Sequence, residues 1–426
     1  MKRVLIVTPN WPPISCPDMH RVRMSVQFFS KFDWEPLILK INPEEQEGIK
    51  DNTLNNTISD CLKIWEAGCL PKFCTSWFGL NNIGLRSFFH LALLGNEIIE
   101  KEKPDLAFFS TTMFPLMSLG RYWYSKYRLP YVLDFQDPWV SDYKGDRFYA
   151  QSWKYKLSQA LAKLLEPFCL RQVAHIISVS PGYVDTLLKR YAWLKSDQFT
   201  VLPFGAAETD FDYLRKYPIK NSYFNPHDGK QHWVYVGRGG TDMAFAVRSF
   251  FQALREIRQQ EPKKFNNLLL HFIGTDYAPG NLARKTIEPL AKESGIEDIV
   301  QEYPHRIPYF EALQCLLDAD ALIVPGSDDP SYTASKIYPY IQAKKPLLAI
   351  FHEKSSVVDV LHSTKAGTVV TFSSKNETFK LSQAIFKSLL KLITLPTQAT
   401  DWQAFEPYSA QNMTHIMSTI FDEIIS

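Results

Sequence analysis

Short apolar runs alternate with longer segments of helical periodicity along the first half of the chain. The strand-like runs there are VLIV, EPLILKI, DLAFFS, YVLDF and HIISVS. Because these runs are short and apolar on both faces, they predict a parallel sheet that helices cover on both sides. The same pattern restarts at HWVYVG and continues through LLLHFIG, DALIVPG, PLLAIF and GTVVTF. We therefore expect an α/β protein with two doubly wound, Rossmann-like domains in tandem.

The boundary between the two expected domains lies near Pro203 to His232. Its later part, NSYFNPHDGKQH, has the Asn, Pro, Asp and Gly content of a loop. We place an N-terminal domain at 1–205, a C-terminal domain at 206–395, and a terminal segment at 396–426. The last segment ends in a helix from about Ser409 whose apolar stripe has no obvious partner in the second sheet, so we expect this helix to cross back to the first domain.

Composition supports two domains and limits the classes of binding partner. A chain of 426 residues with 45% hydrophobic residues exceeds what one core usually supports. Lys and Arg number 47 against 45 for Asp and Glu, which leaves a net charge of +2. Such a balance lacks the positive field that holds nucleic acid, so we expect no nucleic-acid partner.

The cysteines and the apolar runs indicate the compartment. The six cysteines show neither paired metal-ligand spacing nor the density of a disulfide scaffold, which suits a reducing compartment. The start, MKRVLIVTPNWPP, has an apolar run too short for a secretory signal, and we interpret it as a first strand. No run of about 18 apolar residues occurs that would span a membrane. We expect a cytoplasmic protein, attached at most to the inner face of the membrane.

Two stretches are amphipathic and aromatic, at 86–99 and 153–169. In the second, one helical face carries Trp153, Leu157, Leu161, Leu164 and Phe168. Surface helices routinely carry such a stripe toward the core, and we prefer that interpretation for both stretches. The alternative is contact with a membrane surface through an aromatic and basic face.

The residues that follow each strand of the second domain form a coherent set. Ligands of open parallel sheets bind beyond the carboxyl ends of the strands. VYVGRGG places Gly237, Arg238 and Gly239 after one strand, and LHFIGTD places Gly274 and Thr275 after the next. A long hydroxyl-rich loop, GSDDPSYTASK, follows a third strand. Glycines let backbone approach a ligand, and Arg offers a bidentate fork to phosphate oxygens. Three such loops together predict a ligand site.

A helix is expected to begin at Ser335 and Lys336. Free amide groups at a helix start bind anions. We therefore expect a phosphate or diphosphate there, held by backbone amides and by the side chains of Thr333, Ser335, Lys336 and Arg238. The alternative is that the residues from Ser331 onward only cap the helix.

In order and spacing, these motifs resemble the GT-B glycosyltransferases, and among them the large retaining family 4. The similar segments are VTPNWPP with the helix after it, YVLDFQDPWV, IISVSPGYVDTL, VLPFGAAETDF, VYVGRGG, DADALIVPG and SKIYPYIQAKKPLLAI. The resemblance covers nearly the whole chain. It implies a GT-B fold with a cleft between the two domains, a nucleotide-sugar donor bound mainly by the second domain, and an acceptor bound mainly by the first.

The resemblance also implies roles for individual residues. Arg238 matches the position that stabilises the leaving phosphate, and we assign Lys336 and Asp137 to catalysis with it. His305 and Arg306 fall where the family holds the nucleotide base. The expected donor-binding residues are Gly237, Gly239, Gly274, Thr275, His305, Arg306, Ser331, Thr333, Ser335 and Tyr340. In such retaining enzymes no metal is required, and no His, Asp and Glu cluster here has catalytic ligand spacing. We expect no metal and no cofactor besides the nucleotide sugar as co-substrate.

The acceptor side is expected in the first domain. Asp134 and Asp137 follow a strand, and Asp137 would orient an acceptor hydroxyl or steady developing positive charge. Aspartates three apart in a loop also occur as turn formers or ion-pair partners. His20 and Arg21, near the first loop, are expected to contact the acceptor or phosphate; the alternative is that they are solvated charges at a helix start.

Several positions depart from the family pattern. The two family glutamates align with Ser331 and Pro339, so both acids are absent, including the one that grips the donor ribose. A proline inside a helix costs little in the first turn, where we expect Pro339 to lie. Nucleotide handling would then depend on Ser331, Tyr338 or Tyr340, or the activity has been lost.

These observations favour a glycosyltransferase that moves a sugar from a nucleoside-diphosphate donor to a glycan or lipid-linked glycan, in polysaccharide or glycoconjugate biosynthesis. Peripheral membrane contact would suit such an acceptor. The principal alternative is a catalytically degenerate GT-B domain that acts as a binding or scaffold protein. A sugar-nucleotide epimerase and a phosphorylase share the fold and are minor alternatives.

Overall fold

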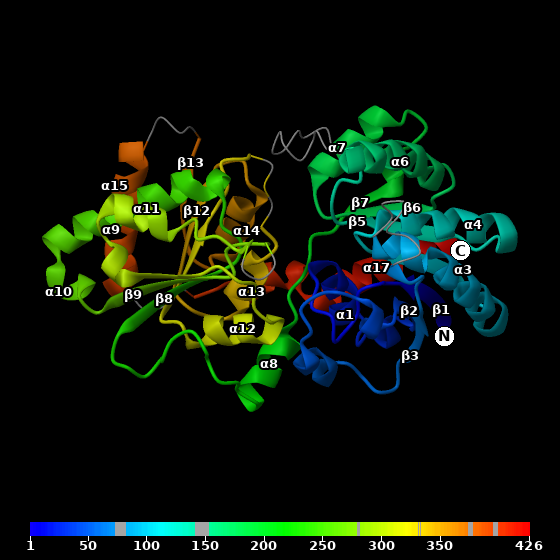
Figure 1. Cartoon of the computed structure of the whole chain (residues 1–426), viewed down its shortest axis with the longest axis horizontal. Coiled ribbons are helices and arrows are strands. Elements are labelled where there is room, and N and C mark those ends of the chain that lie inside the picture. Colours follow the sequence, from blue (N-terminus) through cyan, green and yellow to red (C-terminus); the bar gives the residue numbers. More distant parts are fainter. Residues whose placement is uncertain are drawn as a thin grey trace. The chain divides into compact units, whose positions relative to one another are not determined.

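The computed structural model describes residues 1–72, 82–140, 153–278, 282–330, 332, 334–373, 378–394 and 399–426. The chain forms two compact units (Figure 1). Unit 1 contains Met1–Gly205 together with Ala410–Ser426, and unit 2 contains Ala206–Ser409. Each unit is a parallel sheet flanked by helices, so the predicted α/β class with two doubly wound units is confirmed.

Unit 1 has a seven-stranded sheet in the order β3-β2-β1-β4-β5-β6-β7. The strands are β1 (Lys2–Val7), β2 (Trp34–Ile41), β3 (Lys63–Ala67), β4 (Leu106–Ser110), β5 (Tyr131–Phe135), β6 (His175–Ser178) and β7 (Phe199–Val201). All neighbouring pairs are parallel. The order reverses direction between β1 and β4, which makes that gap the switch point of this sheet.

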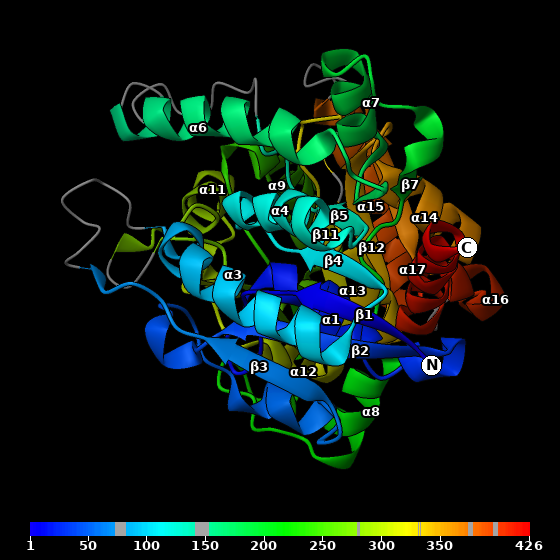
Figure 2. The ribbon, with the colours of Figure 1, turned by 90° about the vertical axis from the view of Figure 1, so that its right-hand side faces the viewer.

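Helices cover both faces of the unit 1 sheet (Figure 2). The helices are α1 (His20–Ser25), α3 (Ile83–Glu102), α4 (Ser118–Tyr127), α6 (Trp153–Leu170), α7 (Pro181–Arg190) and α17 (Ala410–Ile425). Side chains of α3, α4, α6 and α7 share one buried core with alternate residues of the strands. On the opposite face α1 packs against α17. The strands are apolar on both sides because both faces are covered.

The terminal helix α17 belongs to unit 1, as predicted. Its residues Met413, Met417, Ile420 and Phe421 are buried. Phe421 packs against the rings of three residues of the first unit, at centroid distances of 6.1 Å for Phe29, 5.4 Å for Trp34 and 5.5 Å for Phe108. The stripe that had no partner in the second sheet is therefore part of the core of unit 1.

The amphipathic stretches do not both behave as predicted. In α3, residues such as Leu91, Ile98 and Ile99 are buried, which confirms a core-facing helix. The core-facing interpretation is wrong for the stripe of α6, because Leu164 is 68% and Phe168 46% exposed. The opposite side of α6 faces the sheet instead. No helix among the described residues is both long and apolar enough to cross a membrane.

Unit 2 has a six-stranded sheet in the order β10-β9-β8-β11-β12-β13. The strands are β8 (Gln231–Val236), β9 (Leu268–Ile273), β10 (Val300–Tyr303), β11 (Ala321–Pro325), β12 (Leu347–His352) and β13 (Thr368–Phe372). Again all pairs are parallel. Here the switch point lies between β8 and β11, so the loops after these two strands emerge side by side.

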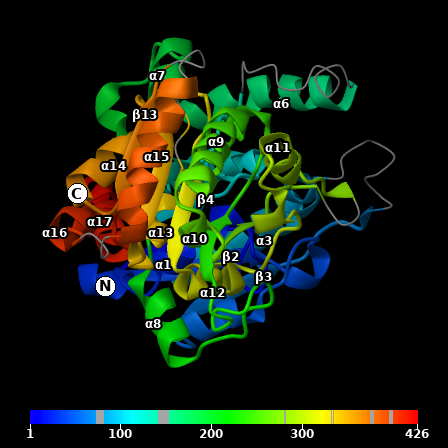
Figure 3. The ribbon, with the colours of Figure 1, turned by 90° about the vertical axis from the view of Figure 1, so that its left-hand side faces the viewer.

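The helices of unit 2 are α8 (Glu208–Lys216), α9 (Ala244–Gln260), α10 (Pro262–Phe265), α11 (Glu288–Ser294), α12 (Tyr309–Asp318), α13 (Ile337–Gln342), α14 (Ser356–Thr364), α15 (Thr378–Thr394) and α16 (Trp402–Phe405). On one face, α9 lies between α11 and α15 (Figure 3). The helix α13 follows the long loop after β11, which places its first turn at the switch point.

Candidate functional site

The three predicted ligand loops of unit 2 meet at the carboxyl edge of its sheet. They follow β8, β9 and β11, which are neighbours in the order β9-β8-β11. The amide of Gly239, after β8, donates to the carbonyl of Thr275, after β9, at 2.6 Å. A Cβ atom built on Gly237 would lie 2.2 Å from the amine of Lys336, which belongs to the loop after β11. The structure therefore brings these predicted residues together.

Lys336 is the most perturbed cation of this edge. Its Nζ donates to the hydroxyl of Tyr235 at 2.7 Å and lies 4.7 Å from the centre of that ring. Burial and the positive charge of Arg238 lower the pKa of Lys336 to about 7. An amine of this pKa gains a proton readily when an anion approaches. Gly237 leaves room for this amine, because a side chain at that position would displace it.

Arg238 lies beside this amine and is held by an acid that sequence reasoning missed. Its two terminal nitrogens donate to the carboxylate of Asp242 at 2.9 and 2.7 Å. Its guanidinium stacks 4.8 Å from the ring centre of Tyr332. Burial opposes ionisation of Asp242, but hydrogen bonds from Arg238 and Ser327 outweigh it and lower the pKa of the carboxyl. An incoming phosphate must therefore share Arg238 with Asp242.

Tyr340 has a structural task in this geometry. Its hydroxyl accepts from the amide of Val236 at 2.6 Å and donates to the carbonyl of the same residue at 3.0 Å. This pair of hydrogen bonds fixes the end of β8 against α13, with the Tyr340 ring buried. Both of these hydrogen bonds lie within unit 2, so they give no support to the predicted contact of Tyr340 with the donor.

The helix start differs slightly from the expected one. Lys336 is the N-cap of α13 and Ile337 its first residue, so Pro339 lies in the first turn, where its missing N–H breaks no helical bond. Ser335 is exposed just before the helix. The predicted donor residues Ser331 and Thr333 lie outside the described residues.

The loops after β9 and β10 carry the residues assigned to the nucleotide base. His305 and Arg306 are exposed. The guanidinium of Arg306 lies 4.8 Å from the ring centre of Tyr277, which is 61% exposed and was not predicted. Gly274 has φ +73°, a left-handed backbone conformation that glycine adopts without strain, which explains why a glycine occurs there.

The hydroxyl of Thr275 donates to a buried carboxylate, so its hydrogen is not available to a ligand. Its hydroxyl donates to Glu302 at 2.6 Å. Glu302 also accepts the amides of Thr286, Ile287 and Glu288 at 2.8 to 3.0 Å. The start of α11 is thus capped by a side chain from β10, and the predicted donor contact of Thr275 does not fit this hydroxyl geometry.

In unit 1 the predicted acceptor residues Arg21 and Asp134 form an enclosed ion pair. Nε of Arg21 donates to Asp134 at 2.7 Å, and both side chains have no exposed surface. Arg21 also donates to the carbonyl of Leu202 at 2.7 Å, and Asp134 accepts from Ser110 at 2.9 Å. Neither side chain presents an atom to an acceptor. The pair instead links α1 and β5 with Leu202, the residue that directly follows β7.

Asp137 lies at the carboxyl edge of the unit 1 sheet, close to a second acid. The nearby Asp18 is buried and accepts from Asn10 at 2.9 Å and from the amide of Thr112 at 3.2 Å. Although Asp137 keeps contact with solvent, surrounding protein partly desolvates its carboxyl, and Asp18 adds negative charge, so the pKa of Asp137 is raised. His20 is half-buried and accepts a hydrogen bond from Arg23 at 3.4 Å.

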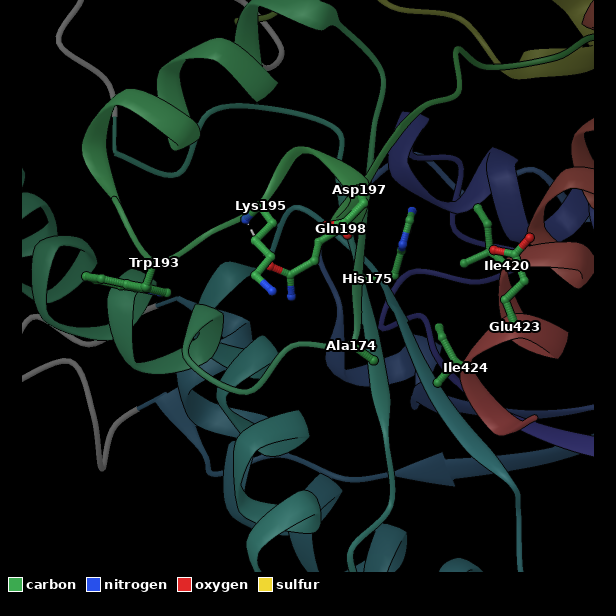
Figure 4. Close-up of a pocket in the computed structure, with 9 residues that line it drawn as sticks. All are labelled: Ala174, His175, Trp193, Lys195, Asp197, Gln198, Ile420, Glu423 and Ile424. Atoms are coloured by element: carbon green, nitrogen blue, oxygen red, sulfur yellow. Dashed lines mark hydrogen bonds between the residues drawn. The ribbon is translucent and has the colours of Figure 1, made fainter.

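A separate hollow of about 560 Å³ lies in unit 1, at the amino ends of β6 and β7 (Figure 4). It is lined by residues 174–175, by residues of the segment 193–198 and by the last turns of α17. Two of its polar groups have partners within unit 1, because His175 bonds Thr200 at 2.9 Å and Gln198 donates to Val173 at 3.3 Å. None of the predicted site residues lines it. Within the described ranges, no group of His, Cys, Asp and Glu has the arrangement of a metal site.

Comparison with known proteins establishes the fold. No protein-family model and no curated protein matches the sequence. Among solved structures, Anabaena HepE in complex with UDP and glucose has a TM-score of 0.60 at 12% identity, over 99% of this chain and 100% of that one. A glycosyltransferase from Rickettsia africae has a TM-score of 0.54 at 14% identity, over 100% and 99% of the chains. The UDP-forming trehalose-phosphate synthase of Burkholderia xenovorans, in complex with glucose-6-phosphate, has 0.60 at 8% identity, over 99% and 100%. The chain has the GT-B fold, as the motifs imply.

Proposed function

We propose that the protein is a glycosyltransferase that moves a sugar from a nucleoside-diphosphate donor to a glycan or lipid-linked glycan. The observation that carries the proposal is the position of Lys336 and Arg238 at the switch point of unit 2, beside Gly237. Two cationic side chains and a close backbone approach at this edge suit a diphosphate. HepE and the trehalose-phosphate synthase, named above, support a uridine nucleotide as the first candidate donor.

The chemistry follows from the perturbed amine. At neutral pH a large fraction of Lys336 is uncharged, since its pKa is about 7. Binding of the diphosphate draws a proton onto Nζ, and the cation then balances the negative charge that develops on the diphosphate as its bond to the sugar breaks and the sugar passes to the acceptor. Tyr235 fixes the amine through its hydroxyl at 2.7 Å, so little reorganisation is required. We propose that this replaces metal assistance and that the configuration at the sugar is retained, as in the family that the motifs resemble.

The base and the acceptor are assigned to other residues. The exposed ring of Tyr277, with Arg306 on one face, offers a platform on which a nucleobase stacks. We assign Asp137, whose pKa is raised by partial desolvation and by Asp18, to the acceptor side. The proposed acceptor is a glycan or a lipid-linked glycan of polysaccharide or glycoconjugate biosynthesis. We place the reaction in the cytoplasm, at the inner face of the membrane.

A second candidate function is a GT-B scaffold without turnover. It is favoured by Pro339, which stands where the family grips the donor ribose with a glutamate, and by Asp242, which already engages both terminal nitrogens of Arg238. A scaffold of this kind would bind a nucleotide weakly and transfer nothing.

Calorimetric titration with uridine, guanosine, thymidine and adenosine diphosphates tests the proposal. At least one should bind, and Arg238→Ala and Lys336→Ala should each weaken binding about tenfold or more, since hydrogen bonds to charged groups contribute about 1.5 to 3 kcal/mol. The matched control is Arg248→Ala, an exposed arginine of α9 paired with Glu293. Absence of binding by all four would contradict the donor site. Binding without hydrolysis or transfer of the corresponding sugar nucleotides would favour the scaffold.

A further inference from the structure

Helix α6 exposes an apolar stripe to solvent. Leu157, Leu164 and Phe168 are 48%, 68% and 46% exposed. Their spacing of seven and four residues puts them on one side of the helix. The opposite side, with Ala162, Cys169 and Leu170, is buried in the core of unit 1. Scattered exposed apolar residues are ordinary, but a continuous stripe along a helix requires an explanation.

The exposed charged side chains on the described part of α6 are positive. Lys156, Lys163 and Arg171 are exposed beside it. The one acid in the sequence from 153 to 171 is Glu166. Glu166 points away from the surface, because its side chain is buried and paired with Arg190 at 2.7 Å. We call Lys156, Leu157, Lys163, Leu164, Phe168 and Arg171 the α6 surface.

Aromatic and cationic side chains of neighbouring elements extend the α6 surface. Phe168 lies 6.0 Å from the guanidinium of Arg121, on α4, the helix beside α6 in Figure 2. At the other margin the guanidinium of Arg171 lies 5.0 Å from the ring of Trp193, which is 43% exposed. Tryptophan beside a cation is typical of segments that lie at the boundary between lipid headgroups and acyl chains.

We propose that the α6 surface docks onto an anionic lipid bilayer, with α6 lying parallel to the membrane plane. The apolar side chains would enter the headgroup boundary while the long stems of the lysines reach acidic headgroups. A protein partner is a weaker match, since lysine is depleted in protein interfaces whereas basic residues beside apolar ones favour acidic lipid. The inference rests on the proposed function only in that docking would bring the enzyme to a lipid-linked acceptor. Its structural basis is independent of the donor site.

Flotation of the full-length chain with vesicles tests the inference. Vesicles of phosphatidylcholine alone are compared with vesicles that also contain phosphatidylglycerol, without any nucleotide or sugar. The wild type should bind the anionic vesicles more tightly. The double substitution Lys156→Gln with Lys163→Gln should weaken binding about fivefold per charge removed. Leu164→Ser with Phe168→Ser should weaken it about tenfold or more.

Matched controls lie in unit 2. Phe379→Ser with Leu282→Ser removes side chains that are 71% and 69% exposed. Lys263→Gln with Lys387→Gln removes two exposed lysines. These variants should bind as the wild type does, and thermal unfolding checks that every variant is folded. Because vesicle binding needs no donor, its failure and the failure of nucleotide binding are seen separately.

Two results would overturn the inference. In the first, the wild type binds anionic vesicles no more tightly than neutral ones, or the substitutions in the α6 surface leave its binding to anionic vesicles unchanged. The other is a dimer in light scattering that Phe168→Ser dissociates while vesicles bind nothing, which would make the α6 surface a contact between copies of the chain.

Discussion

The amine of Lys336 rests against the hydroxyl and the ring face of Tyr235, 2.7 Å from the oxygen and 4.7 Å from the ring centre. Such a position favours the neutral amine, because burial removes water and Arg238 adds repulsion. A ligand that brings negative charge changes this balance. The protonation state of one lysine is therefore expected to report on the binding of the donor.

Nucleoside-diphosphate binding should take up protons above neutral pH. The free Lys336 has a pKa of about 7, and a bound diphosphate raises it. Affinity should then fall as pH rises above about 7, since binding must protonate the amine. Calorimetry at pH 8 in buffers of different ionisation enthalpy should show uptake of up to about one proton per nucleotide. The variant Lys336→Arg, charged throughout, should show none. Equal proton uptake by that variant would locate the titrating group elsewhere.

Replacing the same lysine should stabilise unit 2. An unfolded lysine has a pKa near 10.5, well above the value of about 7 in the folded chain. The folded state therefore binds fewer protons between these values, and stability rises with pH across that window. At pH 6 to 7 the penalty is present, so Lys336→Met should raise the melting temperature while removing nucleotide binding. A melting temperature lowered at pH 6 would show that the hydrogen bond to Tyr235 outweighs the cost of the buried charge.

Gly237→Ala should disturb binding more than stability. A Cβ atom there would lie 2.2 Å from Nζ of Lys336, and the φ of +155° suits glycine. The amine is the end of a flexible side chain and can move, so the fold should persist with a cost of about 1 to 2 kcal/mol. Nucleotide affinity should fall at least tenfold because the amine is displaced. Gly229→Ala, a glycine with open space around it and φ +81°, controls for backbone strain alone. Similar losses of affinity in both variants would remove the steric explanation.

Any transfer activity should survive chelation of metals. The proposed charge balance uses Arg238 and Lys336, with no group that needs a divalent ion. Turnover measured in EDTA should match turnover without it, and added magnesium or manganese should change it little. Complete loss that is restored by a metal would place the protein in another class of transferase.

The fold and the grouping of the loops of the proposed donor site follow from local sequence. Runs such as VLIV and HWVYVG predict strands buried on both faces, and the loops after them must emerge at one edge because the strands are parallel. That is why Gly237, Gly274 and Lys336 could be grouped without knowing the strand order.

Contacts between residues that only the tertiary structure brings together could not be predicted. Arg21 and Asp134 are 113 positions apart, and only the tertiary arrangement shows that they neutralise each other with no exposed surface. Periodicity shows that α6 has an apolar stripe. It does not show that the side with the smaller side chains, Ala162 and Cys169, is the one that faces the sheet. The pairing of Arg238 with Asp242 could not be read from their spacing of four residues either, because the glycine loop between them is not helical.

The terminal helix should stabilise the unit at the opposite end of the sequence. Phe421 is fully buried and packs against Phe29, Trp34 and Phe108, and its neighbour Asp422 accepts from the indole of Trp34 at 2.9 Å. Phe421→Ala should therefore lower the free energy of unfolding of unit 1 by about 3 to 5 kcal/mol, the usual cost of removing a buried aromatic ring.

Urea unfolding followed by tryptophan fluorescence measures this loss, because Trp34 lies against the substituted ring. Phe379→Ala, on the exposed surface of α15, should change stability little and serves as the control. Nucleotide binding by unit 2 should be retained in Phe421→Ala at low urea, since no residue of α17 belongs to that unit. If instead Phe421→Ala unfolded at the same urea concentration as the wild type, α17 would be an appendage whose packing adds nothing to the first unit.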